Sequence, residues 1–422
     1  MRVVVAVSGT RGDVQPASHL AAELHSRGHD VVAAFPPNLT SLATDHGVPV
    51  EPFGYDTRAH LASDVVRRGS HGSVIDRVRS AGELWNLGWS EMTRDLSALV
   101  HRDRPDVVVT GITTEQVAVP LAESVRAAVV GLHHAPVRTN DVHLPGFGAD
   151  GLPAPVTRAA WSAYENVLWT ATRRRENTVR AGLGLPSARR PVPYRLADSG
   201  AVEIQAYDPA LCPPPAGFDG DRRPLVGFLG GAPAPSPLHS ELAAWLDAGD
   251  PPVHIGFGSM PLRAAERSLR RVSEAVRSLG LRALVAPGWN DLDRDVEQEF
   301  GPDADVRVLS GHVDHAALFP RCSVVVHHGG AGTTAAVLRA GRPAVVRPVS
   351  ADQPFWGRRL EDVGAGVMLQ GDDPTPSALA SAIESAAARS DGARRMQDAL
   401  VDPERAVARA ADLVESRIPV AR

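Results

Sequence analysis

Short, uninterrupted runs of apolar residues, most of them valine, recur along this chain and constrain its fold more than any other feature. In the first half these runs are Val3–Val7, Val31–Phe35, Asp106–Thr110 and Ala128–Leu132. In the second half they are Val253–Phe257, Ala283–Ala286, Val306–Leu309, Val324–His327 and Ala344–Val346. Helical patterns lie between them, among them Ala17–Ser26, which Gly28 ends, and Ala264–Leu279. Strands that lack polar alternation and alternate with helices are typical of parallel sheets covered on both faces, so the pattern predicts an α/β fold.

The length and the position of one composition change predict two domains. A chain of 422 residues exceeds what one ordinary core accommodates. Proline, glycine and charge become frequent around Cys212–Pro215 and Asp219–Pro224. We expect a Rossmann-like domain over 1–212, a linker over 213–223, a second Rossmann-like domain over 224–402 and a separate last helix over 403–422. Two such doubly wound halves face a cleft, and ligands of these sheets bind beyond the strand C-termini.

Charge and cysteine content exclude several classes of protein. The 44 Lys and Arg against 49 Asp and Glu give a formal net charge of −5, which argues against nucleic-acid binding. Two cysteines, Cys212 and Cys322, cannot form a disulfide framework or a four-cysteine zinc site. The apolar N-terminal run is too short for a signal peptide, and no segment is long enough to span a bilayer. We expect a cytoplasmic protein without stable membrane insertion, either a monomer or a homodimer.

A glycine-rich turn after the run Val324–His327 is the strongest functional motif. His328-Gly329-Gly330-Ala331-Gly332-Thr333-Thr334 joins this strand to an alanine-rich helix. Glycines let the backbone approach an anion, and free N–H groups at a helix N-terminus favour negative charge. This predicts a diphosphate site built from His328, Gly329, Gly330, Gly332 and Thr333. The alternative is an ordinary glycine turn with a threonine N-cap. A Walker loop is excluded because no lysine precedes the two threonines.

A second motif follows the run Ala344–Val346. In Ser350-Ala351-Asp352-Gln353-Pro354-Phe355-Trp356-Gly357, an acid stands beside an amide at the end of a strand. Asp352 and Gln353 suit a polyol, because sugar hydroxyls need both acceptors and donors of hydrogen bonds. The alternative is a proline-terminated turn with an ordinary aspartate.

A third motif, Gly9-Thr10-Arg11-Gly12-Asp13-Val14-Gln15-Pro16, follows the first strand directly. It places the carboxylate of Asp13 at the C-terminal edge of the sheet, where it could act as a general base. In the alternative reading Asp13 caps a helix and Pro16 occupies its first turn. A dinucleotide-binding fold is disfavoured, because the glycine spacing is wrong and the second strand ends in Phe35-Pro36-Pro37 without a ribose-binding acid.

No metal site is expected. The pairs His133-His134 and His327-His328 place neighbouring side chains on opposite faces of a strand, so neither pair chelates one ion. The series Asp291, Asp293 and Asp295 lies in a charged segment rather than at a strand end.

Four tryptophans in the first half have two open interpretations. Trp85, Trp89, Trp161 and Trp169 are spaced by four and eight residues within each pair. They either line an apolar pocket or form ordinary helix-packing core. We expect ligand specificity to reside in 54–89 and 133–144.

The three motifs together resemble the inverting nucleotide-sugar glycosyltransferases of the GT-B fold. The resemblance covers essentially the whole chain, and its most specific parts are His327–Thr334 and Asp352–Gly357. Gly9–Pro16 is similar to the branch that contains sterol and glycopeptide-antibiotic glycosyltransferases. By position, the resemblance implies that His328, Gly332 and Thr333 hold the diphosphate and that Asp352 and Gln353 contact the sugar.

The resemblance also assigns roles to residues outside the three motifs. Ser259, after Gly258, matches another turn that contacts the diphosphate, and His312 with Val313 matches the loop that receives the nucleobase. Gly9, Thr10, Arg11 and Gly12 would lie near the diphosphate and acceptor. Asp13 stands where many relatives have a catalytic histidine, and no Asp occurs in Val109–Glu115 to orient such a histidine.

The implied activity is metal-independent, inverting transfer of a hexose or deoxyhexose. The sugar would move from UDP or dTDP to a hydroxyl of a small, largely apolar natural product, as in antibiotic biosynthesis, with no further cofactor. The alternatives are a sterol or lipid glycosyltransferase, a sugar-nucleotide epimerase, and a non-catalytic auxiliary protein of the same fold.

Overall fold

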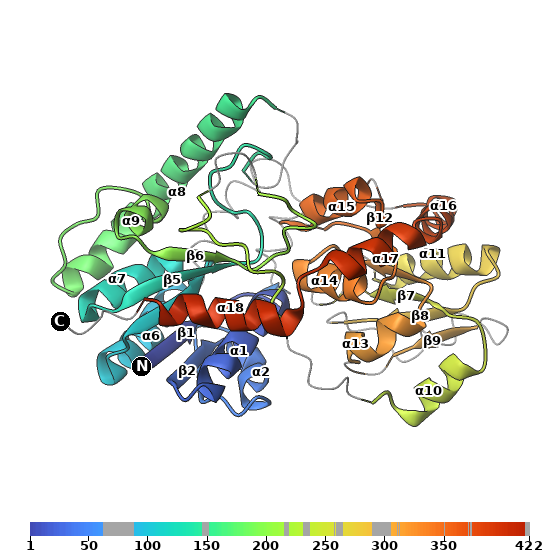
Figure 1. The fold of residues 1–422 in the computed structure, drawn as a ribbon, viewed down its shortest axis with the longest axis horizontal. Coiled ribbons are helices and arrows are strands. Elements are labelled where there is room, and N and C mark those ends of the chain that lie inside the picture. The colour runs from blue at the N-terminus through green and yellow to red at the C-terminus, as the bar shows by residue number, and fades with distance from the viewer. Residues whose placement is uncertain are drawn as a thin grey trace. The chain divides into compact units, whose positions relative to one another are not determined.

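The chain divides into two compact units (Figure 1). The computed structural model describes residues 1–61, 88–145, 152–214, 219–230, 237–256, 258, 265–288, 305–309, 311, 313–349, 351–369, 371 and 374–417. Unit 1 consists of Met1–Pro209, Pro213–Gly231 and Val401–Arg422. Unit 2 consists of Ala210–Cys212 and Ala232–Leu400.

The interval 213–223, expected to be a linker, belongs to unit 1. Its end extends the edge of the first sheet, because Glu203 N donates to Arg222 O at 2.8 Å, and the pairing continues beyond the interval where Leu225 forms a parallel bridge with Gln205. The Arg223 guanidinium also pairs with Glu203 at 2.9 Å. Residues 215–218 of this interval lie outside the described ranges.

The sheet of unit 1 has six parallel strands in the order β3-β2-β1-β4-β5-β6. Their bounds are β1 Arg2–Ala6, β2 Asp30–Phe35, β3 Val50–Pro52, β4 Val107–Gly111, β5 Ala128–His133 and β6 Val202–Gln205. The chain order reverses between β1 and β4, which is the topological switch point at which such sheets bind ligands.

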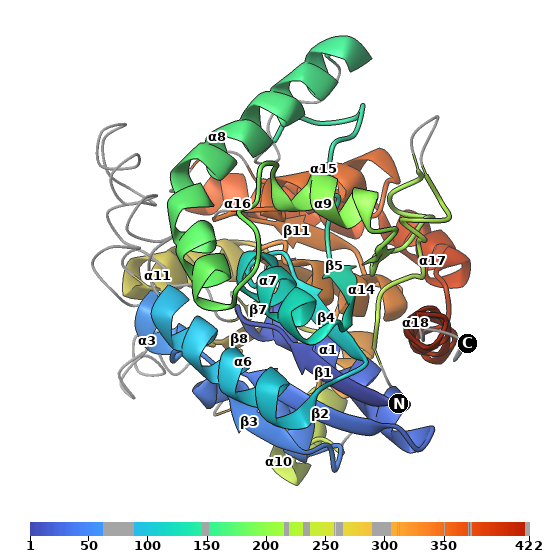
Figure 2. The same cartoon turned by 90° about the vertical axis from the view of Figure 1, so that its left-hand side faces the viewer.

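Helices cover both faces of this sheet. The helices of unit 1 are α1 Arg11–Ser26, η1 Pro37–Leu39, α2 Ser41–Thr44, α3 Thr57–Leu61, α6 Trp89–Asp103, α7 Glu115–Val125, α8 Ala154–Gly182, α9 Val192–Asp198 and α18 Pro403–Glu415. On one face lie α6 and α7 (Figure 2). Their residues Leu96, Val117 and Leu121 pack with Val4 and Val108 of the sheet.

The last helix, α18, packs against α1. At this contact Arg27, which follows α1, reaches Asp412 at 2.6 Å, Glu415 at 3.1 Å and the carbonyl of Ala408 at 3.0 Å. The C-terminal segment therefore completes the N-terminal unit rather than the unit that precedes it in the chain.

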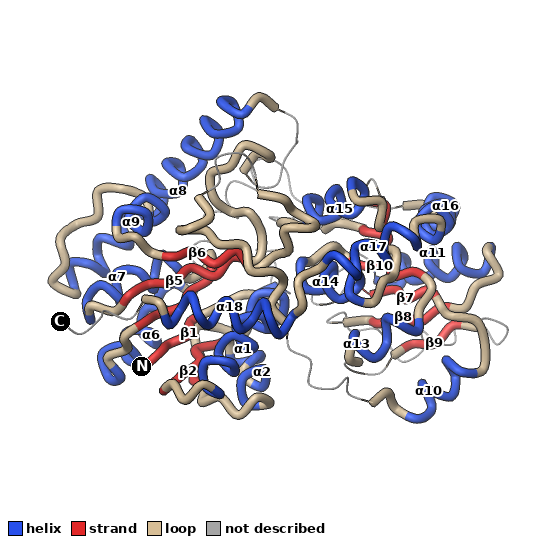
Figure 3. Tube along the Cα trace, in the orientation of Figure 1, coloured by secondary structure: helices blue, strands red, loops and turns tan. Residues whose placement is uncertain are grey.

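Unit 2 is likewise built from strands and helices that alternate along the chain (Figure 3), and its topology repeats that of unit 1. Its parallel sheet has the order β12-β11-β10-β7-β8-β9. The strands are β7 Val253–Gly256, β8 Ala283–Ala286, β9 Val306–Val308, β10 Val324–His327, β11 Ala344–Val346 and β12 Gly366–Met368. When these strands are counted from the first one in the unit, both sheets have the same order, and the switch point of unit 2 lies between β7 and β10.

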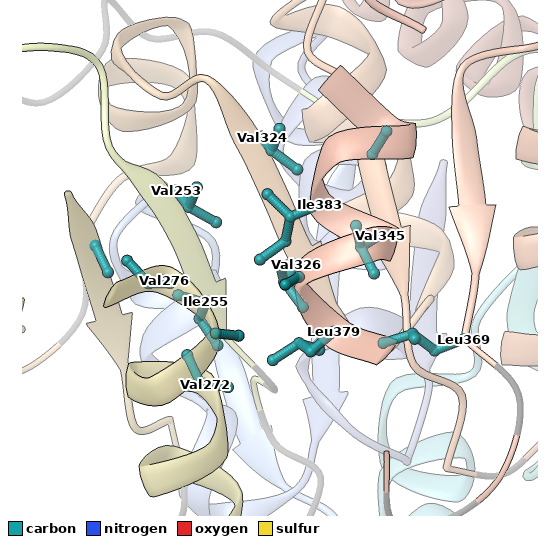
Figure 4. Close-up of a cluster of buried hydrophobic side chains, with 14 of the residues drawn as sticks. Val253, Ile255, Val272, Val276, Val324, Val326, Val345, Leu369, Leu379 and Ile383 are labelled. Carbon is teal, nitrogen blue, oxygen red and sulfur yellow. The ribbon is translucent and has the colours of Figure 1, made fainter. Parts of the chain in front are cut away.

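The core of unit 2 is built from the valine-rich runs themselves (Figure 4). Its helices are α10 Ser240–Asp247, α11 Ala265–Ser278, α13 His315–Leu318, η2 Phe319–Arg321, α14 Ala331–Arg339, α15 Gln353–Asp362, α16 Pro376–Ala387 and α17 Ser390–Ala399. Strand residues Val253, Ile255 and Val326 pack with Val276 of α11 and Ile383 of α16. The two parallel α/β units confirm the predicted fold class.

Trp161 supports the core interpretation of the tryptophans. It is buried in α8, and its indole N–H donates to the carbonyl of His143 at 2.9 Å. Trp85 lies outside the described residues.

None of the described helices is long and apolar enough to cross a membrane.

A buried ionic cluster fixes the loop that follows β5. Arg138 in this loop contacts Glu115 of α7 at 3.1 Å and Glu203 of β6 at 2.8 Å, and all three side chains are buried. Burial alone would raise the pKa of Glu203, but Arg138, His133 and Arg223 together lower it to about 2. The cluster therefore ties the loop to one helix and to one edge strand.

Replacing the Arg138 guanidinium by an apolar chain should destabilise unit 1 strongly. Arg138→Met leaves Glu115 and Glu203 buried without their shared cation, which costs about 3–5 kcal/mol. The matched control is Arg158→Met, because Arg158 pairs with Asp141 at the surface and such pairs contribute at most about 1 kcal/mol. Urea unfolding at pH 7 measures both variants, and equal losses would contradict the account.

Acid should remove the contribution of Glu203 in the wild type. Its folded-state pKa of about 2 lies below the ordinary 4.5, so the stabilisation is present above about pH 4.5 and disappears as the pH falls towards 2.

Candidate functional site

The described residues singled out in the sequence lie in turns at the C-terminal ends of strands. In unit 1 Gly9–Asp13 follow β1, and in unit 2 His328–Thr333 follow β10 while Asp352 and Gln353 follow β11. Each unit therefore presents its polar turns at the edge of the sheet where doubly wound folds bind ligands.

The turn after β1 holds Asp13 in a capping box. Thr10 is the N-cap of α1, and its hydroxyl accepts from Gly12 N at 3.2 Å. In return, Asp13 Oδ2 accepts from Thr10 N at 2.8 Å and from Thr10 Oγ1 at 3.2 Å. Helix α1 begins at Arg11, six residues earlier than predicted, because this box supplies the partners that its first turn needs. Pro16 therefore lies inside the helix, and its expected place in the first turn is wrong.

Gly9 makes room for this carboxylate. It has φ +145°, and a Cβ at this position would lie 2.3 Å from Asp13 Oδ2. Burial raises the pKa of Asp13, while the hydrogen bonds from Thr10 oppose the rise. The turn thus holds a desolvated carboxylate through one oxygen, in a fixed orientation. Arg11 points along the helix and donates to Gln15 Oε1 at 2.9 Å.

Threonines after β4 close the switch point of unit 1. Thr113 Oγ1 donates to the carbonyl of Ser8 at 2.5 Å, and Thr114 Oγ1 donates to that of Ala6 at 3.0 Å. These bonds join the loop after β4 to the end of β1. Many relatives in the resembled family have an aspartate in this loop. The sequence shows that the acid is missing, but it does not predict the hydrogen bonds that Thr113 and Thr114 form instead.

The neighbouring histidines at the end of β5 lie in different surroundings. His133 belongs to the buried ionic cluster, 3.8 Å from Glu115. His134 instead lies beside Asp13, whose main-chain carbonyl acts on its ring, and both of its ring nitrogens are buried without a hydrogen-bond partner. Burial raises the pKa of the Tyr55 phenol, and the charge of the Asp13 carboxylate raises it further. The sequence motifs did not single out His134 or Tyr55, although both lie within the ranges 54–89 and 133–144 that were expected to determine ligand specificity.

In unit 2 the glycine-rich turn has an uncapped helix N-terminus. The N-cap of α14 is Gly330, and no side chain caps it. The threonine N-cap considered from the sequence is therefore wrong, since Thr333 and Thr334 lie inside the first turn. Gly332 and Thr333 remain accessible, whereas Thr334 is buried.

Close packing orients His328 beside this turn. A Cβ on Gly330 would lie 2.5 Å from its Nε2, and one on Gly258, after β7, would lie 3.2 Å from its Cε1. Burial lowers the pKa of His328 to about 4, so the ring is neutral at pH 7 and carries one N–H. His327 accepts from Gly329 N at 3.0 Å and fixes the start of the turn.

The Asp352 and Gln353 side chains lie at the start of α15. Asp352 Oδ2 accepts from the Trp356 indole N–H at 2.7 Å, and Gln353 Oε1 accepts from Val349 N at 2.7 Å. A Cβ on Gly329 would lie 2.9 Å from the carbonyl of Gln353, so the turns after β10 and β11 are in contact. The structure thus brings His328, Gly329, Gly330, Gly332, Thr333, Asp352 and Gln353 to one end of the second sheet.

The remaining predictions concern the nucleobase loop, the turn at Ser259 and the series of aspartates. Val313 lies between β9 and α13. Ser259, His312 and the Asp291–Asp295 series lie outside the described residues. Within the described ranges, no three His, Cys, Asp or Glu side chains are placed to hold a metal ion.

Two Rossmann-like units with glycine turns after their strands are the architecture of the GT-B class of glycosyltransferases. A glycosyltransferase family 28 N-terminal domain matches residues 3–130, and an erythromycin biosynthesis protein CIII-like C-terminal domain matches residues 298–413. An uncharacterized glycosyltransferase of Mycobacterium tuberculosis is 36% identical over 100% of both chains. The vancomycin aglycone glucosyltransferase of Amycolatopsis orientalis is 32% identical over 92% of this chain and 90% of its own length.

A solved structure shares the fold over nearly the whole chain. The glycosyltransferase VinC in complex with dTDP has a TM-score of 0.66 and 21% identity, over 99% of this chain and 100% of its own. From these matches, the chain belongs to the antibiotic-type family of GT-B glycosyltransferases.

Filling the space at Gly9 should disturb the Asp13 carboxylate. Gly9→Ala combines a positive φ with a Cβ 2.3 Å from Asp13 Oδ2, so the hydrogen bonds from Thr10 must break. Gly28→Ala is the matched control, because Gly28 has φ +84° and no atom within 4 Å of a Cβ. Positive φ costs each variant about 1–2 kcal/mol. We expect Gly9→Ala to lose roughly 1.5–3 kcal/mol more in denaturant unfolding, and equal losses would contradict the packing argument.

Proposed function

We propose that this glycosyltransferase inverts the anomeric centre while it moves a hexose or deoxyhexose from a UDP- or dTDP-sugar to a hydroxyl of a small, largely apolar natural product. The observation that carries the proposal is the partly buried Asp13 carboxylate at the switch point of unit 1, whose Oδ2 is held by Thr10. The vancomycin relative supports the acceptor class, and the VinC complex supports a dTDP-type donor.

Asp13 acts as the general base in this proposal. The acceptor oxygen attacks the anomeric carbon from the face opposite the diphosphate, and its proton passes to the Asp13 carboxylate. The bond from the anomeric carbon to the diphosphate oxygen breaks, and the diphosphate leaves with the electron pair. The raised pKa makes Asp13 a better proton acceptor than an exposed aspartate.

The turn after β10 would stabilise the leaving diphosphate. The uncapped N-terminus of α14 at Gly330 offers backbone N–H groups and the positive end of the helix dipole. Gly332, Thr333 and the neutral ring of His328 can add hydrogen bonds to it. Asp352 and Gln353 would contact sugar hydroxyls, Ser259 the diphosphate, and His312 with Val313 the nucleobase.

Asp13→Asn tests the base without removing the cap. An asparagine oxygen can still accept from Thr10 N, so the helix start is preserved. We expect transfer to fall about 10²–10⁴-fold while UDP or dTDP affinity stays unchanged. Asp402→Asn is the control, because Asp402 caps α18 at Arg405 N and should leave turnover at the wild-type value. Wild-type turnover in Asp13→Asn would remove Asp13 from the mechanism.

Transfer should not require a divalent cation. The N-terminus of α14 would supply the positive potential that magnesium supplies in other nucleotide enzymes, and the neutral His328 ring would add a hydrogen-bond donor. The rate of sugar transfer measured after dialysis against EDTA should equal the untreated rate. Activity that disappears with EDTA and returns with magnesium would contradict this part of the proposal.

A further inference from the structure

His134 is a partly buried imidazole whose two ring nitrogens are poorly paired within the protein. Both Nδ1 and Nε2 are buried and neither has a partner in good hydrogen-bond geometry, and the main-chain carbonyl of Asp13 is the polar group that acts on the ring. An unpaired buried polar atom costs about 1–3 kcal/mol, and native proteins pair nearly all of them. A ring that keeps two such atoms beside Asp13 therefore indicates a ligand that completes them.

The chemistry of the ring limits what that ligand can offer. Burial and the neighbouring His133 lower the pKa of His134 to about 4, although the Asp13 main-chain carbonyl opposes this shift. At pH 7 the ring therefore has one N–H donor and one nitrogen acceptor. A hydroxyl can pair with either nitrogen, and an ether or carbonyl oxygen can pair with the N–H.

The ring is held in place before any ligand binds. His133 is the last residue of β5, and its carbonyl accepts from Ala206 N at 2.7 Å. Four residues after His134, Arg138 fixes the loop through the buried ionic cluster. A preorganised polar group of this kind discriminates between ligands that do and do not satisfy it.

We propose that His134 is a specificity-determining residue that binds a second acceptor oxygen next to the hydroxyl whose proton passes to Asp13. This inference rests on the proposed transferase function and narrows its acceptor class. The acceptor then carries two neighbouring oxygens, as in a catechol, a vicinal diol or a hydroxyl beside an ether or carbonyl. Tyr55, which also lies near Asp13, borders the same region of unit 1.

Matched acceptor pairs test this inference. The probes are 6,7-dihydroxycoumarin against 7-hydroxycoumarin and 2,3-dihydroxynaphthalene against 2-naphthol, with UDP-glucose and dTDP-glucose as sugar donors. The readout is the ratio of kcat/KM within each pair, because general structural damage lowers both members equally. Wild-type protein should prefer the dioxygenated member about tenfold.

Two substitutions at His134 separate hydrogen bonding from packing. His134→Phe keeps a ring without polar atoms and should bring the ratio to about one, whereas His134→Gln keeps a donor and an acceptor and should restore part of it. His46→Phe is the control, because His46 packs against His19 at 5.0 Å and should keep the wild-type ratio.

Each other result is decisive. A wild-type ratio near one, or a ratio that His134→Phe leaves unchanged, overturns the assignment. No transfer to any probe, while UDP or dTDP still raises the melting temperature, overturns the two-oxygen acceptor class but leaves the transferase proposal intact. Failure of both nucleotides to bind overturns the proposed function itself.

Discussion

Close approach at glycine is the constraint on which the site of each unit depends. In unit 1 the Asp13 carboxylate occupies the space that a side chain on Gly9 would need, and in unit 2 the His328 ring does the same beside Gly330. Each functional group is therefore in close contact with the glycine backbone of the turn that follows a buried strand. Because that backbone belongs to a rigid parallel sheet, the carboxylate and the imidazole are oriented before a ligand arrives.

Identical strand order in the two sheets explains why the polar turns gather where they do. All strands are parallel, but in each sheet the order of the strands reverses beside the first strand of the unit. The loops after β1 and β4 therefore meet at the switch point of unit 1, and the loops after β7 and β10 meet at that of unit 2. The buried Arg138 cluster extends this arrangement in unit 1, since it fixes the loop that begins with His134. Packing and ionic pairing thus position residues from distant parts of the chain.

Apolar runs predicted the buried strands well, and tertiary partners account for what they missed. The runs 324–327, 344–346 and 283–286 form β10, β11 and β8 with the predicted bounds. Strand β6 was missed because its sequence, Val-Glu-Ile-Gln, carries Glu203 and Gln205, whose burial depends on Arg138, His133 and Tyr207. The turns after β1, β10 and β11 were visible as motifs. His134 was not, because its importance lies in the partners that it lacks.

The choice of nucleotide distinguishes a transferase that uses UDP- or dTDP-sugars from other nucleotide-binding proteins. The melting temperature should be measured with UDP, dTDP, GDP, NAD and ATP for the wild type, for Gly330→Ala and for Gly28→Ala. The account predicts that UDP or dTDP alone raises it, that Gly330→Ala loses this shift because its Cβ displaces His328, and that Gly28→Ala keeps it. Stabilisation by NAD or ATP only, or a shift that survives in Gly330→Ala, would contradict the account.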